Sequence, residues 1–154
     1  MEKPHGKNLR IGRYSEPNRI YSITVVTHKR RPFFRDFKSA RTVIKVLQKH
    51  EQLQFAQTLC FVLMPDHLHW LMQLGEKKDL GQTIQSFKSI CTRKLGKTIF
   101  QKGFFDHAIR QEEDIRDLAR YIVANPIRAG LVSKIHDYPH WDAVWMSEQS
   151  AVNV

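Results

Sequence analysis

The stretch LCFVLMPDHLHWLMQL, residues 59–74, decides the fold of this chain. Pro65 and Asp66, a pair typical of tight turns, separate two apolar runs of strand length. So short a connection predicts that the two runs form neighbouring antiparallel strands. The second run contains His67 and His69, and residues i and i+2 of a strand point to the same side. An otherwise apolar strand is therefore expected to present two imidazoles on one face.

The rest of the sequence surrounds this hairpin with strand and helix patterns. The expected strands are residues 19–28, 55–64, 67–74 and 104–110, and the expected helices are residues 36–51, a helix that begins after Asp79, and residues 112–125. The last helix ends before Pro126, because the residue before a proline resists helical geometry. This order predicts an α+β fold, with a ferredoxin-like antiparallel sheet and the helices packed on one face.

The length of 154 residues and the composition, 42% hydrophobic and 26% charged, are those of one globular domain. We expect a basic N-terminal arm at residues 1–18, the domain at 19–140 and a tail at 141–154. No apolar run approaches the ~20 residues that span a bilayer, and the N-terminus has no signal-peptide core, so a cytoplasmic protein without a membrane partner is expected. Cys60 and Cys91 fit buried thiols in a reducing compartment, although one disulfide would also fit.

Positive charge is concentrated in two segments of a chain with 25 Lys or Arg, 15 Asp or Glu and a formal net charge of +10. Residues 1–35 and residues 80–105 are rich in Lys and Arg, and the second segment has no acid. Such stretches are typical of nucleic-acid-binding proteins, although a merely basic protein or one that binds an anionic membrane surface would look similar. The candidate DNA contacts are Lys3, Lys7, Arg10, Arg13, Lys88, Arg93, Lys94, Lys97 and Lys102.

Two imidazoles on one strand face form a ready two-point chelate, because neutral imidazole is the commonest metal ligand. Alternatively, His67 and His69 are only hydrogen-bonded. A metal would need further ligands from elsewhere in the chain. The expected helix 112–125 offers Tyr121 and Asn125, one turn apart and about 6 Å along its axis. An amide oxygen suits a hard cation such as Mg²⁺ or Mn²⁺, but each of these two residues alone also fits an ordinary position on a helix.

Four stretches together give a more specific signal. MPDHLH at 64–69 and YIVANPIRAGLV at 121–132 resemble the HUH single-tyrosine transposases, and most closely their REP-associated branch. TVVTHKRRPFF at 24–34 and FFDHAIRQEEDIRDLARYI at 104–122 share this resemblance, which extends from about residue 19 to 140.

The resemblance implies roles for individual residues. His67 and His69 would hold a divalent metal, Mg²⁺ or Mn²⁺, and Tyr121 on a C-terminal helix would be the nucleophile. Asn125 would complete the metal site, where related insertion-sequence enzymes usually have glutamine. Asp106 and His107 are candidate helpers in deprotonating the tyrosine.

The implied activity is that of a transposase that cleaves and rejoins single-stranded or REP-type hairpin DNA through a 5′-phosphotyrosine. A bacterial, nucleoid-associated protein that acts as a monomer or homodimer is expected. Two alternatives stay open: a domesticated DNA-binding protein of the same fold that no longer cuts, and a phosphodiesterase in which water attacks. Tyr138 is the rival candidate for the nucleophile.

Overall fold

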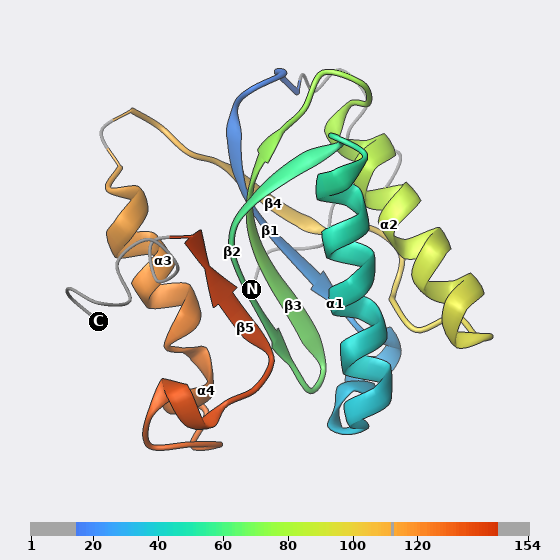
Figure 1. Cartoon of the computed structure of the whole chain (residues 1–154), viewed down its shortest axis with the longest axis vertical. Coiled ribbons are helices and arrows are strands. Elements are labelled where there is room, and N and C mark those ends of the chain that lie inside the picture. The colour runs from blue at the N-terminus through green and yellow to red at the C-terminus, as the bar shows by residue number, and fades with distance from the viewer. Residues whose placement is uncertain (1–14, 112, 145–154) are drawn as a thin grey trace.

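A computed structural model of the chain describes residues 15–111 and 113–144, which form a five-stranded antiparallel sheet of order β4-β1-β3-β2-β5 with flanking helices (Figure 1). The strands are β1 Ile20–Val26, β2 Ala56–Met64, β3 His67–Leu74, β4 Phe105–Ala108 and β5 Trp141–Ala143. The helices are α1 Phe37–Gln52, α2 Leu80–Leu95, α3 Ile115–Val123 and α4 Asn125–Arg128, and the 3-10 turns are η2 His28–Arg30, η3 Phe33–Arg35 and η4 Ile135–Asp137.

The β2–β3 hairpin has the form that its sequence predicts. Met64 pairs with His67 across the Pro65-Asp66 turn, and β3 lies between β2 and β1. The order of the first four strands, β4-β1-β3-β2, is that of a ferredoxin-like sheet. Asp79 is the N-cap of α2, as expected, and forms a capping box with Gln82.

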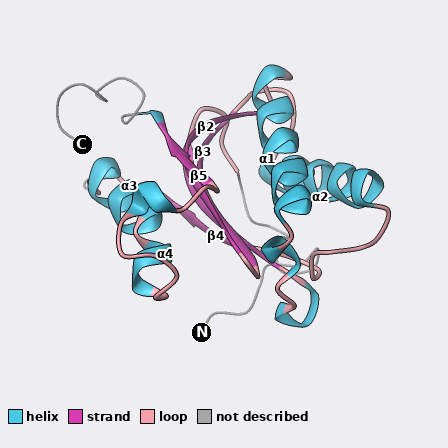
Figure 2. Cartoon of the chain, turned by 60° about the horizontal axis from the view of Figure 1, so that its bottom comes forward, coloured by secondary structure: helices cyan, strands magenta, loops and turns pink. Residues whose placement is uncertain are grey.

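The two faces of the sheet carry separate helical layers (Figure 2). α1 and α2 pack on one face, where the larger core includes the buried side chains of Ile23, Trp70 and Phe87. α3 packs on the other face, where Ile122 joins a smaller core with Leu71.

The prediction of an antiparallel α+β fold is confirmed, but the prediction that all helices share one face is wrong for α3. On β3, Leu68 and Trp70 belong to the α1–α2 core and Leu71 belongs to the α3 core, and all three are fully buried. A strand between two helical layers is apolar on both sides. The nearly continuous apolar run at residues 59–74 is therefore the sequence signal for a second layer.

The body of the protein extends beyond both predicted domain boundaries. The backbone N–H of Asn18 donates to the carbonyl of Leu74 at 2.7 Å, within the predicted arm. Trp141–Ala143, assigned to the tail, pair with β2 as strand β5. Cys60 and Cys91 are buried free thiols. Among the described residues, no helix is long and apolar enough to cross a membrane.

Candidate active site

His67 and His69 project from β3 on the face that α3 covers, the same face as Leu71. Their ring centroids are 4.8 Å apart and the rings are almost perpendicular, at 87°. The His67 side chain is 16% exposed. The predicted neighbouring imidazoles are therefore present and accessible to a small ligand.

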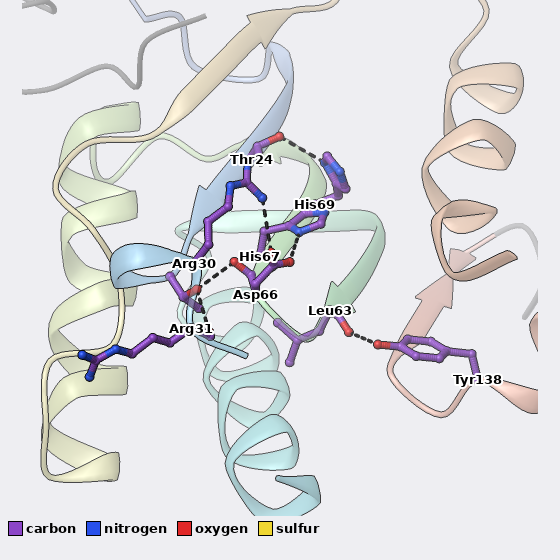
Figure 3. Close-up of polar contacts among 9 residues, drawn as sticks. Thr24, Arg30, Arg31, Leu63, Asp66, His67, His69 and Tyr138 are labelled. Carbon is purple, nitrogen blue, oxygen red and sulfur yellow. Dashed lines mark hydrogen bonds and ion pairs between the residues drawn. The ribbon is translucent and has the colours of Figure 1, made fainter. Parts of the chain in front are cut away.

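The Nδ1 atom of each ring is engaged by a neighbouring residue (Figure 3). Nδ1–H of His67 donates to Oδ1 of Asp66 at 2.7 Å. Nδ1 of His69 lies 3.1 Å from the hydroxyl oxygen of Thr24, which is directly opposite on β1. Because both contacts use Nδ1, the Nε2 atoms are left for another ligand. A hydrogen bond at one ring nitrogen that fixes the orientation of the other is the usual arrangement around metal-binding histidines.

The environment of His69 keeps its ring neutral. Burial, together with the nearby charges of His67, Arg128 and Arg30, lowers the pKa of His69 to about 3. Metals bind the neutral form of imidazole, so this ring needs no deprotonation before it acts as a ligand at neutral pH.

Asp66 connects His67 to a cation. Its Oδ2 lies 3.4 Å from Nη1 of Arg30, while its Oδ1 holds His67. Burial raises the pKa of the Asp66 carboxyl, but the hydrogen bond and charge of His67 and those of Arg30 outweigh burial, so the net shift is downward. Asp66 is therefore a carboxylate at neutral pH and a strong acceptor for the His67 ring.

Tyr121 lies on α3 and is 63% exposed, unusually open for a large aromatic side chain. The guanidinium carbon of Arg128, on α4, lies 3.8 Å from the centroid of the Tyr121 ring. This distance is that of a stacked cation–π contact. Since the charge of Arg128 also reaches His69, the tyrosine, the arginine and the histidine pair share one side of the sheet.

Asn125 begins α4, one helical turn after Tyr121. Its side-chain amide nitrogen donates to the carbonyl of Ile122 at 3.0 Å. This bond uses the nitrogen and leaves the amide oxygen to accept or coordinate. Within residues 15–111 and 113–144, no three His, Cys, Asp or Glu side chains are grouped in a way that could hold a metal. A metal at His67 and His69 would therefore need a ligand of another type, such as an amide oxygen.

The rival nucleophile is engaged elsewhere. The hydroxyl of Tyr138 donates to the carbonyl of Leu63 at 2.5 Å (Figure 3), and burial raises the pKa of Tyr138 to about 12. A phenol that is buried and bonded in this way is a poor nucleophile at neutral pH.

The two candidate helpers on β4 also have other surroundings. Nε2 of His107 lies 3.0 Å from a carboxylate oxygen of Glu113, which precedes α3. Asp106 pairs with Ile23, whose side chain lies in the α1–α2 core, so Asp106 faces away from His67 and His69. His107 therefore has another partner, and Asp106 lies on the opposite face from the histidine pair.

The candidate DNA contacts differ in their surroundings. Lys3, Lys7, Arg10 and Arg13 lie outside the described residues. Arg93, Lys94, Lys97 and Lys102 are exposed. Lys88, however, donates from its ammonium group to the carbonyls of Gln101 and Gly103, and burial lowers its pKa to about 8. Lys88 therefore holds α2 to the following loop, unlike the four exposed cations, and its contact with DNA stays a prediction.

Sequence reasoning missed four residues of this site: Thr24, Arg30, Asp66 and Arg128. Asp66 had a local signal, because it directly precedes His67. Thr24 becomes a partner of His69 only through the β1–β3 register, which the sequence does not specify. Arg128 lies seven residues after Tyr121, a helical spacing that the break at Pro126 obscured.

The chain is similar to known proteins in sequence and in fold. Residues 16–125 match the protein family described as "Transposase IS200 like". A Haemophilus influenzae protein provisionally named a REP-associated tyrosine transposase is 29% identical over 139 residues, which cover 79% of this chain and 77% of that protein. The Escherichia coli K12 REP-associated tyrosine transposase is 35% identical over 81 residues, 51% of this chain and 49% of that protein.

A solved structure of a REP-associated tyrosine transposase bound to a REP hairpin has the same fold. It superposes with a TM-score of 0.71 at 25% sequence identity, over 99% of this chain and 87% of that one. Since the family match covers residues 16–125, the chain belongs to the IS200-like transposase family, and it is similar in sequence and fold to REP-associated tyrosine transposases.

Proposed function

We propose that this protein cleaves and rejoins DNA strands with Tyr121 as the nucleophile and a divalent ion at His67 and His69. The observation that carries the proposal is the exposed phenol of Tyr121, held beneath Arg128 on the sheet face that presents two oriented histidines. An exposed tyrosine, a stacked arginine and two partly exposed imidazoles thus share one side of the sheet.

The residues fit a divalent ion. Both Nδ1 atoms are occupied by Asp66 and Thr24, His69 is neutral, and the amide nitrogen of Asn125 is used while its oxygen is left over. His67, His69 and Asn125 would hold the ion, with Mg²⁺ or Mn²⁺ suited to the oxygen ligand. When bound, it supplies Lewis-acid polarisation and orientation of a phosphate oxygen.

The reaction attributed to Tyr121 is an in-line displacement. Its phenolic oxygen, after losing its proton to solvent, attacks phosphorus, while the bond from phosphorus to the 3′ oxygen breaks. The departing oxygen takes up a proton and becomes a 3′ hydroxyl, and the 5′ phosphate stays on the tyrosine. Because one phosphate ester replaces another, the step can be reversed by a second 3′ hydroxyl without an external energy source.

Arg128 would position and assist Tyr121. Its guanidinium covers one face of the ring at 3.8 Å, which limits the rotation of a side chain that is otherwise exposed. A cation at this place would also attract the phosphate and stabilise the negative charge on its oxygens in the transition state.

The substrate that we propose is single-stranded or hairpin DNA of the REP type. The solved relative is described as bound to a REP hairpin. In this chain, the exposed Arg93, Lys94, Lys97 and Lys102 would contact phosphates, as would Lys3, Lys7, Arg10 and Arg13 of the arm. The proposed site of action is the bacterial nucleoid, with the protein as a monomer or homodimer.

The decisive experiment looks for a covalent adduct. The protein is incubated with a labelled hairpin oligonucleotide and Mg²⁺ or Mn²⁺, with EDTA as the control, and separated under denaturing conditions. We expect a metal-dependent adduct with the wild type and with Tyr138→Phe, and none with Tyr121→Phe. Cleavage without an adduct would mean that water attacks, and binding without cleavage would mean a non-cutting DNA-binding protein.

A further inference from the structure

A short basic turn, residues 29–31, follows β1 beside the β2–β3 hairpin. Lys29 and Arg30 both have left-handed backbone conformations, with φ of 55° and 51°. For residues with a Cβ atom, this conformation is sterically disfavoured. Consecutive strained residues of this kind persist only where the surroundings hold them, and they concentrate at ligand-binding sites.

Contacts from Thr27 hold the basic turn. The backbone N–H of Thr27 donates to the carbonyl of Asp66 at 3.0 Å, and its hydroxyl donates to the carbonyl of Arg31 at 2.8 Å. Thr27 is fully buried. The turn is therefore fixed to the residue that precedes His67, and its strained geometry is built into the fold.

The strain has a visible consequence for the side chains. Arg30 extends toward Asp66, which also holds His67, whereas Arg31 points away from the two histidines (Figure 3). Lys29, Arg30 and Arg31 are all exposed. One end of the turn thus lies at the margin of the histidine pair, and the other end leads away from it.

A second cationic segment lies beside the far end of the turn. The N–H of His28 donates to the carbonyl of Ile99 at 2.7 Å, which joins the turn to the loop after α2. In that loop the ammonium of Lys97 lies 5.3 Å from the ring centroid of Phe33. Lys97 was one of the expected DNA contacts, and this packing connects it to the basic turn.

We propose that Lys29, Arg30, Arg31 and Lys97 form one phosphate-binding track for the single-stranded segment of DNA that leads into the His67–His69 site. This inference rests on the proposed function and adds the path of the strand to it. Two nearby aspartates have other partners: Asp66 holds His67 and Arg30, and Asp36 caps α1 and also interacts with the charge of Lys97. The positive charges of Lys29 and Arg31 therefore remain available to phosphates, and these are the two that the test removes.

The test measures DNA binding without chemistry. Metal-free protein in EDTA is titrated with a fluorescent hairpin that has a ten-nucleotide single-stranded flank, at several salt concentrations. The variant Lys29→Gln/Arg31→Gln removes two charges and spares Arg30, which touches Asp66. The matched control is Lys45→Gln/Lys49→Gln, which removes two exposed charges from α1, on the sheet face opposite to His67 and His69.

Loss of two phosphate contacts should reduce the slope of log affinity against log salt concentration by roughly 1.4. Lowering the salt from 1 M to 0.1 M should therefore strengthen binding by the variant about 25-fold less than binding by the wild type. The control should change the slope much less. Removing the single-stranded flank should weaken the wild type more than the Lys29→Gln/Arg31→Gln protein, because two of the four proposed contacts to the flank are already gone in that variant.

Equal slopes for the two double variants, or a variant that still loses affinity with the flank as the wild type does, would overturn the track. Thermal unfolding of each variant checks that the fold is intact. These outcomes are separate from the proposed function. An adduct on Tyr121 can form whether or not the DNA strand follows this path, and DNA binding measured in EDTA requires no cleavage.

Discussion

Removing the carboxylate of Asp66 should weaken the binding of a divalent ion and leave the fold intact. Asp66 accepts Nδ1–H of His67 at 2.7 Å, and this bond keeps Nε2 of His67 directed toward the proposed ion. The backbone carbonyl of Asp66, which anchors Thr27, is kept by any substitution. The side chain can therefore be changed without removing the contact that holds the basic turn.

The size of the effect depends on which feature of the carboxylate is lost. Loss of the partner behind a metal-binding histidine typically costs 10–100-fold in metal affinity, or about 1.4–2.7 kcal/mol. Asp66→Asn keeps an oxygen that can accept from His67 but loses the charge, so we expect the lower end, roughly 10-fold. Asp66→Ala loses both, and roughly 100-fold is expected.

Calorimetric titration of metal-free protein with Mn²⁺ at pH 7.5 measures these affinities directly. Asp36→Asn is the control, because it changes an aspartate that caps α1 and does not touch His67. If Asp66→Ala binds Mn²⁺ within two-fold of the wild type while unfolding at the same temperature, the carboxylate does not orient a metal ligand. If the wild type itself does not bind Mn²⁺, the proposal that His67 and His69 hold a divalent ion is wrong.

Three further predictions follow from other contacts. Tyr138→Phe should lower the free energy of unfolding by about 0.5–1.5 kcal/mol in urea, through loss of its bond to Leu63, and retain adduct formation. Arg128→Ala should slow adduct formation by at least roughly 2–5-fold, the value of an exposed cation–π contact, and an unchanged rate would remove Arg128 from the site. Burial lowers the pKa of His50, so on acidification the unfolded chain gains a proton near pH 6.5, before the folded chain does. The free energy of unfolding should therefore be highest above this pH and decrease below it, and the decrease should be smaller in His50→Gln. Urea midpoints at pH 7.5 and 5.5 measure this difference.

Local sequence patterns predicted the parts of the fold that depend on neighbouring residues. The Pro65-Asp66 turn fixed the β2–β3 hairpin, and the N-cap at Asp79 placed the start of α2. β5 had no such signal. Trp141–Ala143 are too short for a periodic pattern, and they form a strand because β2 offers a free edge on that side of the sheet.

The candidate site depends both on local sequence patterns and on the way distant elements pack. The spacing of His67 and His69 is local and directly predicts two imidazoles on one face. Whether Tyr121 faces them depends on which side of the sheet α3 covers, and the order of the expected strands and helices alone supports the interpretation of one helical layer. The run at residues 59–74 argues against that interpretation on its own terms, because a strand covered on one face would alternate with polar residues, and β2 is instead buried from Cys60 to Met64.

A two-sided sheet also explains why the histidines are found where they are. On the α1–α2 face, β3 meets a large apolar core, in which an imidazole would need its own partners, as buried His50 does with Val46 and Ser86. On the other face α3 covers only part of β3, so the side chain of His67 is partly exposed to solvent while that of Leu71 is fully buried. Incomplete cover by α3 therefore creates a region where a strand is apolar enough to fold and still leaves two histidine rings partly exposed, on the side of the sheet that carries α3 and Tyr121.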